Sequence, residues 1–110
     1  VQNLLVEECA ADLANMRFAK LKNVAFEGCK LTGTDWTSAH LDGARFTDCD
    51  LSGAQFSQVN VIAARFERCT LDGVNGVSSL AGAVIDPANL LDLSHQLADA
   101  LGITIATRQD

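Results

Sequence analysis

Large apolar residues recur at every fifth position along most of this chain. The unbroken run has twelve members: Met16, Leu21, Phe26, Leu31, Trp36, Leu41, Phe46, Leu51, Phe56, Val61, Phe66 and Leu71. Because 48% of the residues are apolar, such a run has a chance probability of about one in ten thousand. A period of five fits neither the 3.6-residue repeat of a helix nor the two-residue repeat of a strand. The backbone must therefore turn every five residues.

A second line of residues lies two positions before the large ones, and its members are small. They are Ala14, Ala19, Val24, Cys29, Thr34, Ala39, Ala44, Cys49, Ala54, Val59, Ala64 and Cys69. A unit of five residues cannot enclose a core by itself, so it must wind and stack on copies of itself. Like residues return after 20 positions, as the four cysteines do at Cys9, Cys29, Cys49 and Cys69. Four sides per coil would place like above like.

Four consecutive units, at residues 39–43, 44–48, 49–53 and 54–58, resemble the A-(D/N)-L-x-x unit of the pentapeptide-repeat family. The resemblance covers residues 14–75 well and residues 1–13 loosely. It implies an all-β solenoid, a right-handed quadrilateral β-helix of about four coils, with the large and small lines inside and three residues per unit facing water. The departures from the pattern are Thr34 in a small slot, Val61 at a centre, and Gly76, where the large line stops.

We expect one domain, with residues 1–80 as the β-helix, of which 1–13 are an irregular first coil, and 81–110 as a cap and tail. At this length a single core burying roughly 65% of the unfolded surface is expected. The expected core comprises Leu21, Phe26, Leu31, Trp36, Leu41, Phe46, Leu51, Phe56, Phe66, Leu71, Cys29, Cys49 and Cys69. Val1, Val6, Ala11 and Met16 continue the phase, while 11–13 offer a register shifted by two. The first residue, Val1, and the lack of a cap before it favour further coils upstream over a frayed edge.

The cap begins with a helix start signal. Asp86 can cap free N–H groups, Pro87 suits the first helical position, and Gly102 supplies a stop. Leu90, Leu93, Leu97 and Leu101 follow at helical spacing, and residues 103–105 read as a short closing strand. The simplest role of the helix is a lid over the last coil, because an open solenoid end exposes unpaired backbone.

This C-terminal element also resembles the end of the gyrase-protecting, quinolone-resistance members of the family, where it makes a twofold dimer. The resemblance implies a homodimer through residues 86–106. Two residues off the main stripe would widen the apolar surface. The candidate interface is Leu90, Leu91, Leu93, Leu97, Ala98 and Leu101.

The cysteines lie one per coil without clustered ligand spacing or converging histidines, which argues against zinc. A disulfide between adjacent coils would be strained, because the side chains point in parallel directions. We expect all four to be small buried residues with reduced thiols, which indicates a cytoplasmic setting. The chain has no apolar stretch of about 18 residues that could cross a bilayer.

The outward positions indicate no enzyme and no cofactor. His40 falls on a ladder with Lys20 and Asn60, neither of them a base-orienting acid, and no serine has a Gly-x-Ser-x-Gly context. His95 lies beside Ser94 on the cap helix, and the glycines of the repeats fall at tight corners instead of in a phosphate loop. The other ladders mix charges, as a solvated surface does.

We therefore favour a non-enzymatic protein-interaction scaffold with an unknown partner. The alternative is a DNA-mimicking modulator of DNA gyrase or another type II topoisomerase that protects it from quinolones, as resembling proteins do. Residues 1–80 have a net charge of only −3, whereas a DNA column of about 20 Å carries roughly a dozen charges. A pI of about 4.6 disfavours direct nucleic-acid binding. A recognition patch could form at Ile62, Arg45, Arg65 and Arg68, whose simpler interpretation is ordinary surface.

Overall fold

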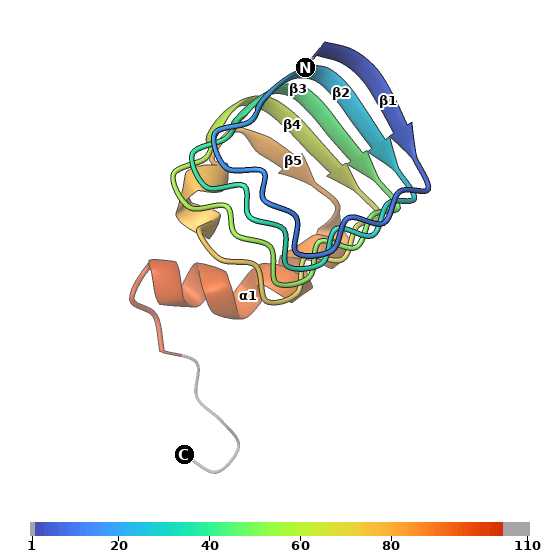
Figure 1. The fold of residues 1–110 in the computed structure, drawn as a ribbon. Coiled ribbons are helices and arrows are strands. Elements are labelled where there is room, and N and C mark those ends of the chain that lie inside the picture. The colour runs from blue at the N-terminus through green and yellow to red at the C-terminus, as the bar shows by residue number, and fades with distance from the viewer. Residues whose placement is uncertain (1, 105–110) are drawn as a thin grey trace.

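The strands of this protein stack side by side along one axis (Figure 1). The computed structural model describes residues 2–104 and contains one parallel five-stranded sheet in the order β1-β2-β3-β4-β5. The strands are β1 (Gln2–Glu7), β2 (Lys20–Glu27), β3 (His40–Thr47), β4 (Asn60–Glu67) and β5 (Ala83–Ile85). Because β5 pairs with β4, the sheet continues beyond residue 80, where we placed the end of the solenoid.

The register between neighbouring strands gives the length of one coil. Phe26 pairs with Phe46, and Phe46 with Phe66, so one circuit takes 20 residues. Isolated parallel bridges join the coils on the other sides in the same register, as at Lys30, Asp50 and Thr70. The fold is a β-solenoid of about four turns with one C-terminal helix, as the five-residue period predicts.

The corners of the coil depend on left-handed backbone that recurs every five residues. A positive φ allows the backbone to turn tightly, but it strains any residue that has a Cβ. Glycine occupies five of these positions, and residues with a side chain, most of them polar, occupy the rest. The corner columns are Glu8, Gly28, Asp48 and Arg68; Leu13, Gly33, Gly53 and Gly73; and Phe18, Ser38 and Gln58, with Asn3, Asn23 and Gly43 inside the strands.

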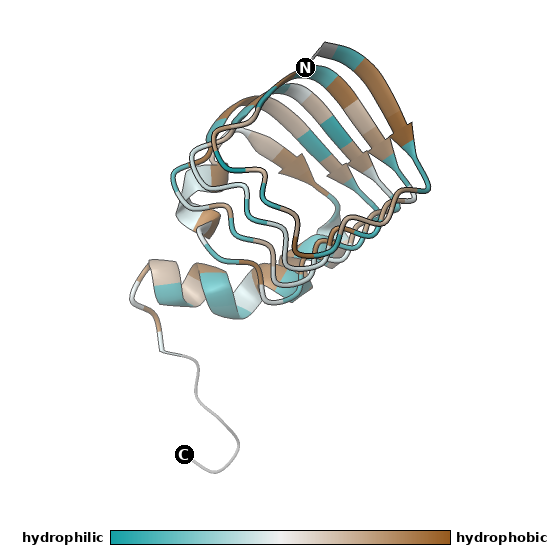
Figure 2. Cartoon of the chain, viewed as in Figure 1, coloured by the Kyte–Doolittle hydropathy of each residue, from teal (hydrophilic) through white to brown (hydrophobic). Residues whose placement is uncertain are grey.

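Aromatic rings from successive coils stack inside the tube. Phe26 and Phe66 lie on either side of Phe46, and the ring centroid of each is 5.0 Å from that of Phe46. Trp36 stacks on Phe56 with a centroid distance of 6.4 Å. Trp36 also meets Phe46 edge to face. Every residue that we expected in the core is buried in the structure, and Val61 and Met16 are partly buried against it. Figure 2 shows bands of hydrophobic and hydrophilic residues across the strands.

Thr34, the polar residue in a small slot, has a structural reason. Its hydroxyl donates to the Leu31 carbonyl at 2.8 Å and accepts the indole N–H of Trp36 at 2.7 Å. The buried indole would otherwise leave its donor unpaired, which is costly in an apolar interior. The departure from the small apolar pattern therefore allows a tryptophan in the stack.

The large line stops at Gly76 because the chain passes close to the coil below. A Cβ at Gly76 would lie 2.5 Å from the backbone nitrogen of Ser57. From Gly76 the chain enters a 3-10 helix, η1 (Val77–Leu80), then β5, and then the helix α1 (Pro87–Ala100), whose N-cap is Asp86. The predicted helix start, with Pro87 at its first turn, is confirmed.

The helix α1 packs on the last coil, as Figure 1 shows. It buries Leu93, Ala98 and Asn89. The Asn89 amide donates to the Cys69 carbonyl at 2.6 Å, which ties the helix to the top of the core. Leu90 and Leu101, expected on the packed stripe, are exposed instead, so the buried face is rotated from the predicted one.

Three other expectations need correction. Residues 103–104 form no strand, and Ile105 lies outside the described residues. Cys9, in the first described coil, is exposed, whereas the other cysteines are buried. The shifted register at residues 11–13 is wrong, since Leu13 is exposed while Ala11 packs against the core.

Candidate interaction surfaces

The outward side chains form the columns that the 20-residue repeat predicts. His40 pairs in register with Lys20 and Asn60, and Arg45 pairs with Arg65. Ion pairs also join side chains of neighbouring coils on the outer surface, for example Arg17 with Asp35 at 3.9 Å. Such exposed pairs contribute little to stability, typically about 0–1 kcal/mol. The columns are therefore available for contacts with other molecules.

Some outward carboxylates serve the fold rather than a site. The carboxylate of Asp50 accepts hydrogen bonds from the hydroxyl and backbone N–H of Ser52, and both lower its pKa. Asp35 has a lowered pKa for the same reason, because it accepts from the hydroxyl and N–H of Thr37. Both are contacts between residues two positions apart, and they stabilise the turn that follows the acid.

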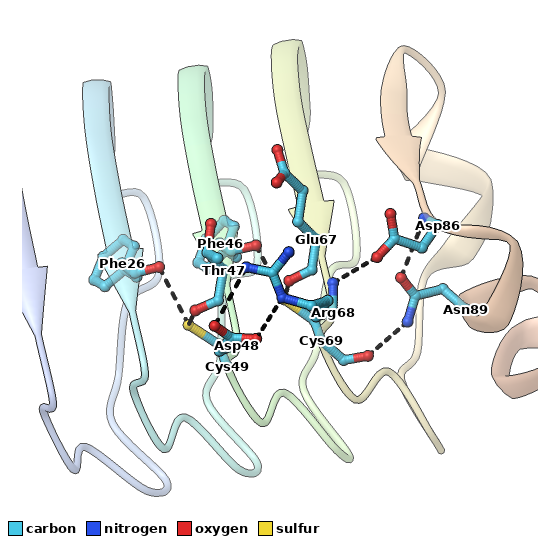
Figure 3. A network of polar contacts seen from close by, with 10 residues as sticks. All are labelled: Phe26, Phe46, Thr47, Asp48, Cys49, Glu67, Arg68, Cys69, Asp86 and Asn89. Carbon is cyan, nitrogen blue, oxygen red and sulfur yellow. Dashed lines mark hydrogen bonds and ion pairs between the residues drawn. The ribbon is translucent and has the colours of Figure 1, made fainter.

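A polar network joins the coils to the start of α1 (Figure 3). The guanidinium of Arg68 donates to Asp48 on the neighbouring coil at 2.8 Å, and this contact lowers the pKa of Asp48. The backbone N–H of Arg68 donates to the Asp86 carboxylate at 2.6 Å. Arg68 thus belongs to this corner, and it does not line the surface around Ile62.

A shallow trough crosses the outer surface of the sheet over β3, β4 and β5. It has a volume of about 310 Å³. Its floor is made mostly of glycine and alanine, with two arginines and two larger apolar residues around it. The lining residues are Gly43, Ala44, Arg45, Ile62, Ala63, Ala64, Arg65, Gly82 and Val84.

The trough coincides with an irregularity in the sheet. Leu41 pairs with Val61 but Asp42 pairs with Ala63, so Ile62 is an extra residue in β4, and the register recovers at Ala64. The positions equivalent to Ala63 in the three earlier coils are Gly43, Asn23 and Asn3, and all three have a positive φ. Ala63 does not have a positive φ, and an alanine in that conformation would be strained by about 1–2 kcal/mol. Ala63 therefore takes another path, and Ile62 is displaced outward as a β-bulge.

The two arginines of the trough share one acid. Glu67 lies 3.3 Å from Nη2 of Arg45 and 3.3 Å from Nε of Arg65. Ile62 and Val84 have 69% and 49% of their surface exposed. The trough thus combines cationic and apolar walls on a flat floor.

A second surface is the outer side of α1. Leu91 is 78% exposed, and Leu90, Leu101 and Ile103 are exposed near it. Of the interface that we expected, Leu93 and Ala98 are buried within the protomer and Leu97 is half-buried, while residues 105–106 lie outside the described part of the chain. Beside the helix lies an apolar cleft of about 260 Å³, lined by Val77, Ser78, Leu80, Ala81, Ala83, Ile85, Leu93 and Leu97.

The structure places the polar candidates for chemistry apart from one another. His40 and His95 are exposed on the sheet and on α1, and Nδ1 of His40 lies 3.5 Å from Nδ2 of Asn60. Ser94 donates to the Leu91 carbonyl of its own helix. Within residues 2–104 no group of three or more histidines, cysteines or acids could hold a metal ion. In that same part of the chain, α1 is too short and too polar to cross a membrane.

The inner thiols are held by backbone carbonyls. Cys49 donates to the Phe26 carbonyl at 3.4 Å, and Cys69 donates to the Phe46 carbonyl at 3.1 Å (Figure 3). Burial raises the pKa of Cys29, and contact with Cys69 together with burial raises the pKa of Cys49. Cys29 and Cys49 are thus packing residues that do not readily form the reactive thiolate.

The five-residue period, the 20-residue coil and the inward columns all agree with a known sequence profile. The profile described as the pentapeptide repeat region matches residues 5–76. The chain belongs to the pentapeptide-repeat family. A search of curated proteins found no significant match.

Two solved pentapeptide-repeat structures are similar to this one. One is a trypsin-treated variant of QnrB1, a plasmid-mediated fluoroquinolone resistance protein, with a TM-score of 0.61 and 25% identity over 64% of this chain. The other is a pentapeptide repeat protein from the thylakoid lumen of Arabidopsis thaliana, with a TM-score of 0.53 and 28% identity over 64% of this chain. The matched region spans 36% and 52% of those two chains.

The sequence missed part of the trough. It pointed to Ile62, Arg45 and Arg65, but not to Val84 or Gly82, which come from β5 and the residue before it. A signal was present in the column Asn3, Asn23, Gly43 and Ala63, where the fourth member cannot take the backbone of the first three without strain.

Proposed function

We propose that this protein is a non-enzymatic scaffold that binds another protein through an outer face of the solenoid. The observation that carries the proposal is the sheet surface itself, which presents columns of outward side chains with the trough on it. Repeat solenoids commonly use such extended surfaces for binding. A reducing, cytoplasmic setting would suit the unpaired thiols.

The scaffold role can be tested by photo-crosslinking in cells. A photoreactive amino acid would replace one outward residue on each side of the coil, for example Lys30, Arg65 or Gln55. A crosslinked protein that is captured from one side and not from the others would support a defined binding face. Crosslinks from no side would contradict the proposal.

A second candidate function is modulation of DNA gyrase with protection from quinolones. Similarity to QnrB1 favours it, and the net charge of −6 could steer the protein toward a DNA-binding surface. A supercoiling assay with purified gyrase, with and without a quinolone, tests it directly. Protection at micromolar protein would place this function first, and the absence of any effect would exclude it.

We also propose a homodimer formed through the outer side of α1. Leu90, Leu91 and Leu101 are large exposed apolar residues, which soluble surfaces usually scatter and here are grouped. The cleft beside α1 could receive a side chain from a second copy. Light scattering should show a dimer that Leu91→Asp with Leu101→Asp converts to a monomer, while Leu13→Asp on the first coil does not. A wild-type mass that stays monomeric at all concentrations would exclude the dimer.

A further inference from the structure

We propose that the trough over β3, β4 and β5 binds an extended acidic segment of a partner protein that carries an apolar side chain next to its carboxylates. The carboxylates would pair with Arg45 and Arg65, and the apolar side chain would pack between Ile62 and Val84. This inference rests on the proposed scaffold function and names the face and the chemistry of the partner.

Charge gives the first argument. The protein has a net charge of −6, yet the only charged residues that line the trough are two arginines. They are paired in register on neighbouring strands, which places like charges close together. Glu67 is the acid that contacts both, so one positive charge remains uncompensated. A carboxylate from another molecule would complete the pairing, and arginine favours bidentate contacts with carboxylates.

Apolar surface gives the second argument. Ile62 and Val84 rise from a floor of glycine and alanine; Ile62 is largely exposed and Val84 is about half exposed. In the two preceding coils the position of Ile62 holds Lys22 and Asp42, which are polar as an outward position normally is. Burying one large apolar side chain contributes about 1.5–3 kcal/mol. The arginines and the two apolar residues together therefore favour a segment that carries both carboxylates and an apolar side chain.

The shape favours a peptide over a small molecule. Neighbouring strands lie about 4.8 Å apart, so a trough over three strands is about 10 Å long. An extended chain rises about 3.3 Å per residue, and three residues would fill this length. Small-molecule sites usually enclose most of their ligand, whereas this trough lies open on the sheet surface. A partner protein could cover surface beyond the trough and so gain the affinity that an open site lacks.

The backbone gives the last argument. The sheet is regular from β1 to β3, and its register shifts where Ile62 leaves the plane. The pairing of β4 with β5 is offset by 19 residues instead of 20, which brings Val84 beside Arg65. Bulges often redirect a side chain at a functional position. The irregularity thus assembles the trough from residues that a perfect repeat would have kept apart.

Fluorescence polarisation with labelled peptides tests the inference. The probe is an eight-residue peptide that alternates glutamate and leucine, compared with one that has glutamine for glutamate and one that has alanine for leucine. We expect the first to bind at least about tenfold more tightly than either of the others, which corresponds to about 1.4 kcal/mol. Its affinity should fall as salt is raised, because the contacts are between exposed charges.

Variants of the protein separate the trough from the rest of the surface. Arg45→Gln with Arg65→Gln, and separately Ile62→Ser, should each weaken binding of the glutamate-leucine peptide at least about tenfold, a change of about 1.4 kcal/mol. The matched control is Arg17→Gln, an exposed arginine on the first coil that should leave binding unchanged. Thermal melting would verify that each variant is folded.

Equal binding of the glutamine peptide, or binding that survives the double arginine substitution in a folded protein, would overturn the inference. Equal binding of the alanine peptide would show an anion site without the apolar part and would also overturn it. Failure of the peptide together with crosslinks from another side of the solenoid would remove the trough and leave the scaffold function standing. Absence of crosslinks from every side would remove both.

Discussion

At the level of single residues, position within the five-residue unit decides burial. Phe46 is fully buried while its neighbour Arg45 is exposed, because adjacent positions of one unit point to opposite sides of the wall. The core could therefore be predicted from spacing alone. Cys9 could not, because the unit places it inward but burial also requires a coil on both sides. A periodic rule describes the middle of a stack better than its ends.

The thiols provide a test at this scale. We expect one cysteine of four, Cys9, to react quickly with a thiol reagent in the native protein. Cys29, Cys49 and Cys69 should react at least about a hundred times more slowly, because labelling requires local opening of the coil. Mass spectrometry of the labelled peptides would identify the sites. Cys9→Ser should remove the fast phase, and a fast phase that survives in this variant would contradict the burial of the inner thiols.

At the level of elements, backbone conformation separates what could be predicted from what could not. The corners follow the period, and glycines 33, 53 and 73 lie at the tight turns that their spacing indicates, whereas Gly43, also expected at a corner, lies inside β3. The bulge at Ile62 does not follow from the period. It lies where Ala63 departs from the left-handed backbone of its column, and a backbone change at one residue leaves the apolar pattern unchanged. The trough was therefore only partly visible in the sequence.

Two glycines test the geometry of the corners. Gly53 has φ of +71° and open space where a Cβ would stand, so Gly53→Ala should cost only the backbone strain, about 1 kcal/mol. Gly76 has a similar φ, but a Cβ there would meet the Ser57 and Phe56 backbone. Gly76→Ala should therefore lower the free energy of unfolding by clearly more than Gly53→Ala. Urea denaturation would measure both, and equal losses would contradict the close approach.

The attachment of α1 provides the next test. Asn89→Ala would remove the capping box with Asp86 and leave the Cys69 carbonyl without its buried donor. We expect a loss of about 1–3 kcal/mol in the free energy of unfolding. The control is Asn60→Ala on an exposed column, which should change it by less than about 0.5 kcal/mol. Equal effects of the two variants would show that the contact of Asn89 with Cys69 contributes nothing.

At the level of the whole molecule, stability should vary along the solenoid axis. Each coil contacts only its neighbours, so stability is approximately a sum of coil and interface contributions. Strand β3 is paired on both sides with full-length strands, whereas β1 has a partner on one side among the described residues. The first coil also exposes Leu4, Leu5 and Leu13. The first described coil is therefore less well supported than the middle of the solenoid.

Hydrogen exchange would measure this gradient. We expect the amides of β3 to be the most protected and those of β1 to exchange fastest among β1–β4, because β1 can open locally without disrupting the rest. Exchange in mild urea should release β1 before β3. Uniform protection across the four strands would instead show that the protein opens as one cooperative unit.

Within residues 2–104, the helix α1 and its N-cap make their polar contacts to the coils with the last turn alone, at Arg68, Cys69 and Leu71. The coils beneath are thus interchangeable building blocks, set apart from the terminating element. Duplicating residues 40–59 would add one coil, lengthen the solenoid by about 4.8 Å and continue both stacks of aromatic rings, while the capping helix would be unchanged. In this architecture, genetic duplication of a coil can lengthen the solenoid in equal increments while the terminal helix α1 keeps its contacts.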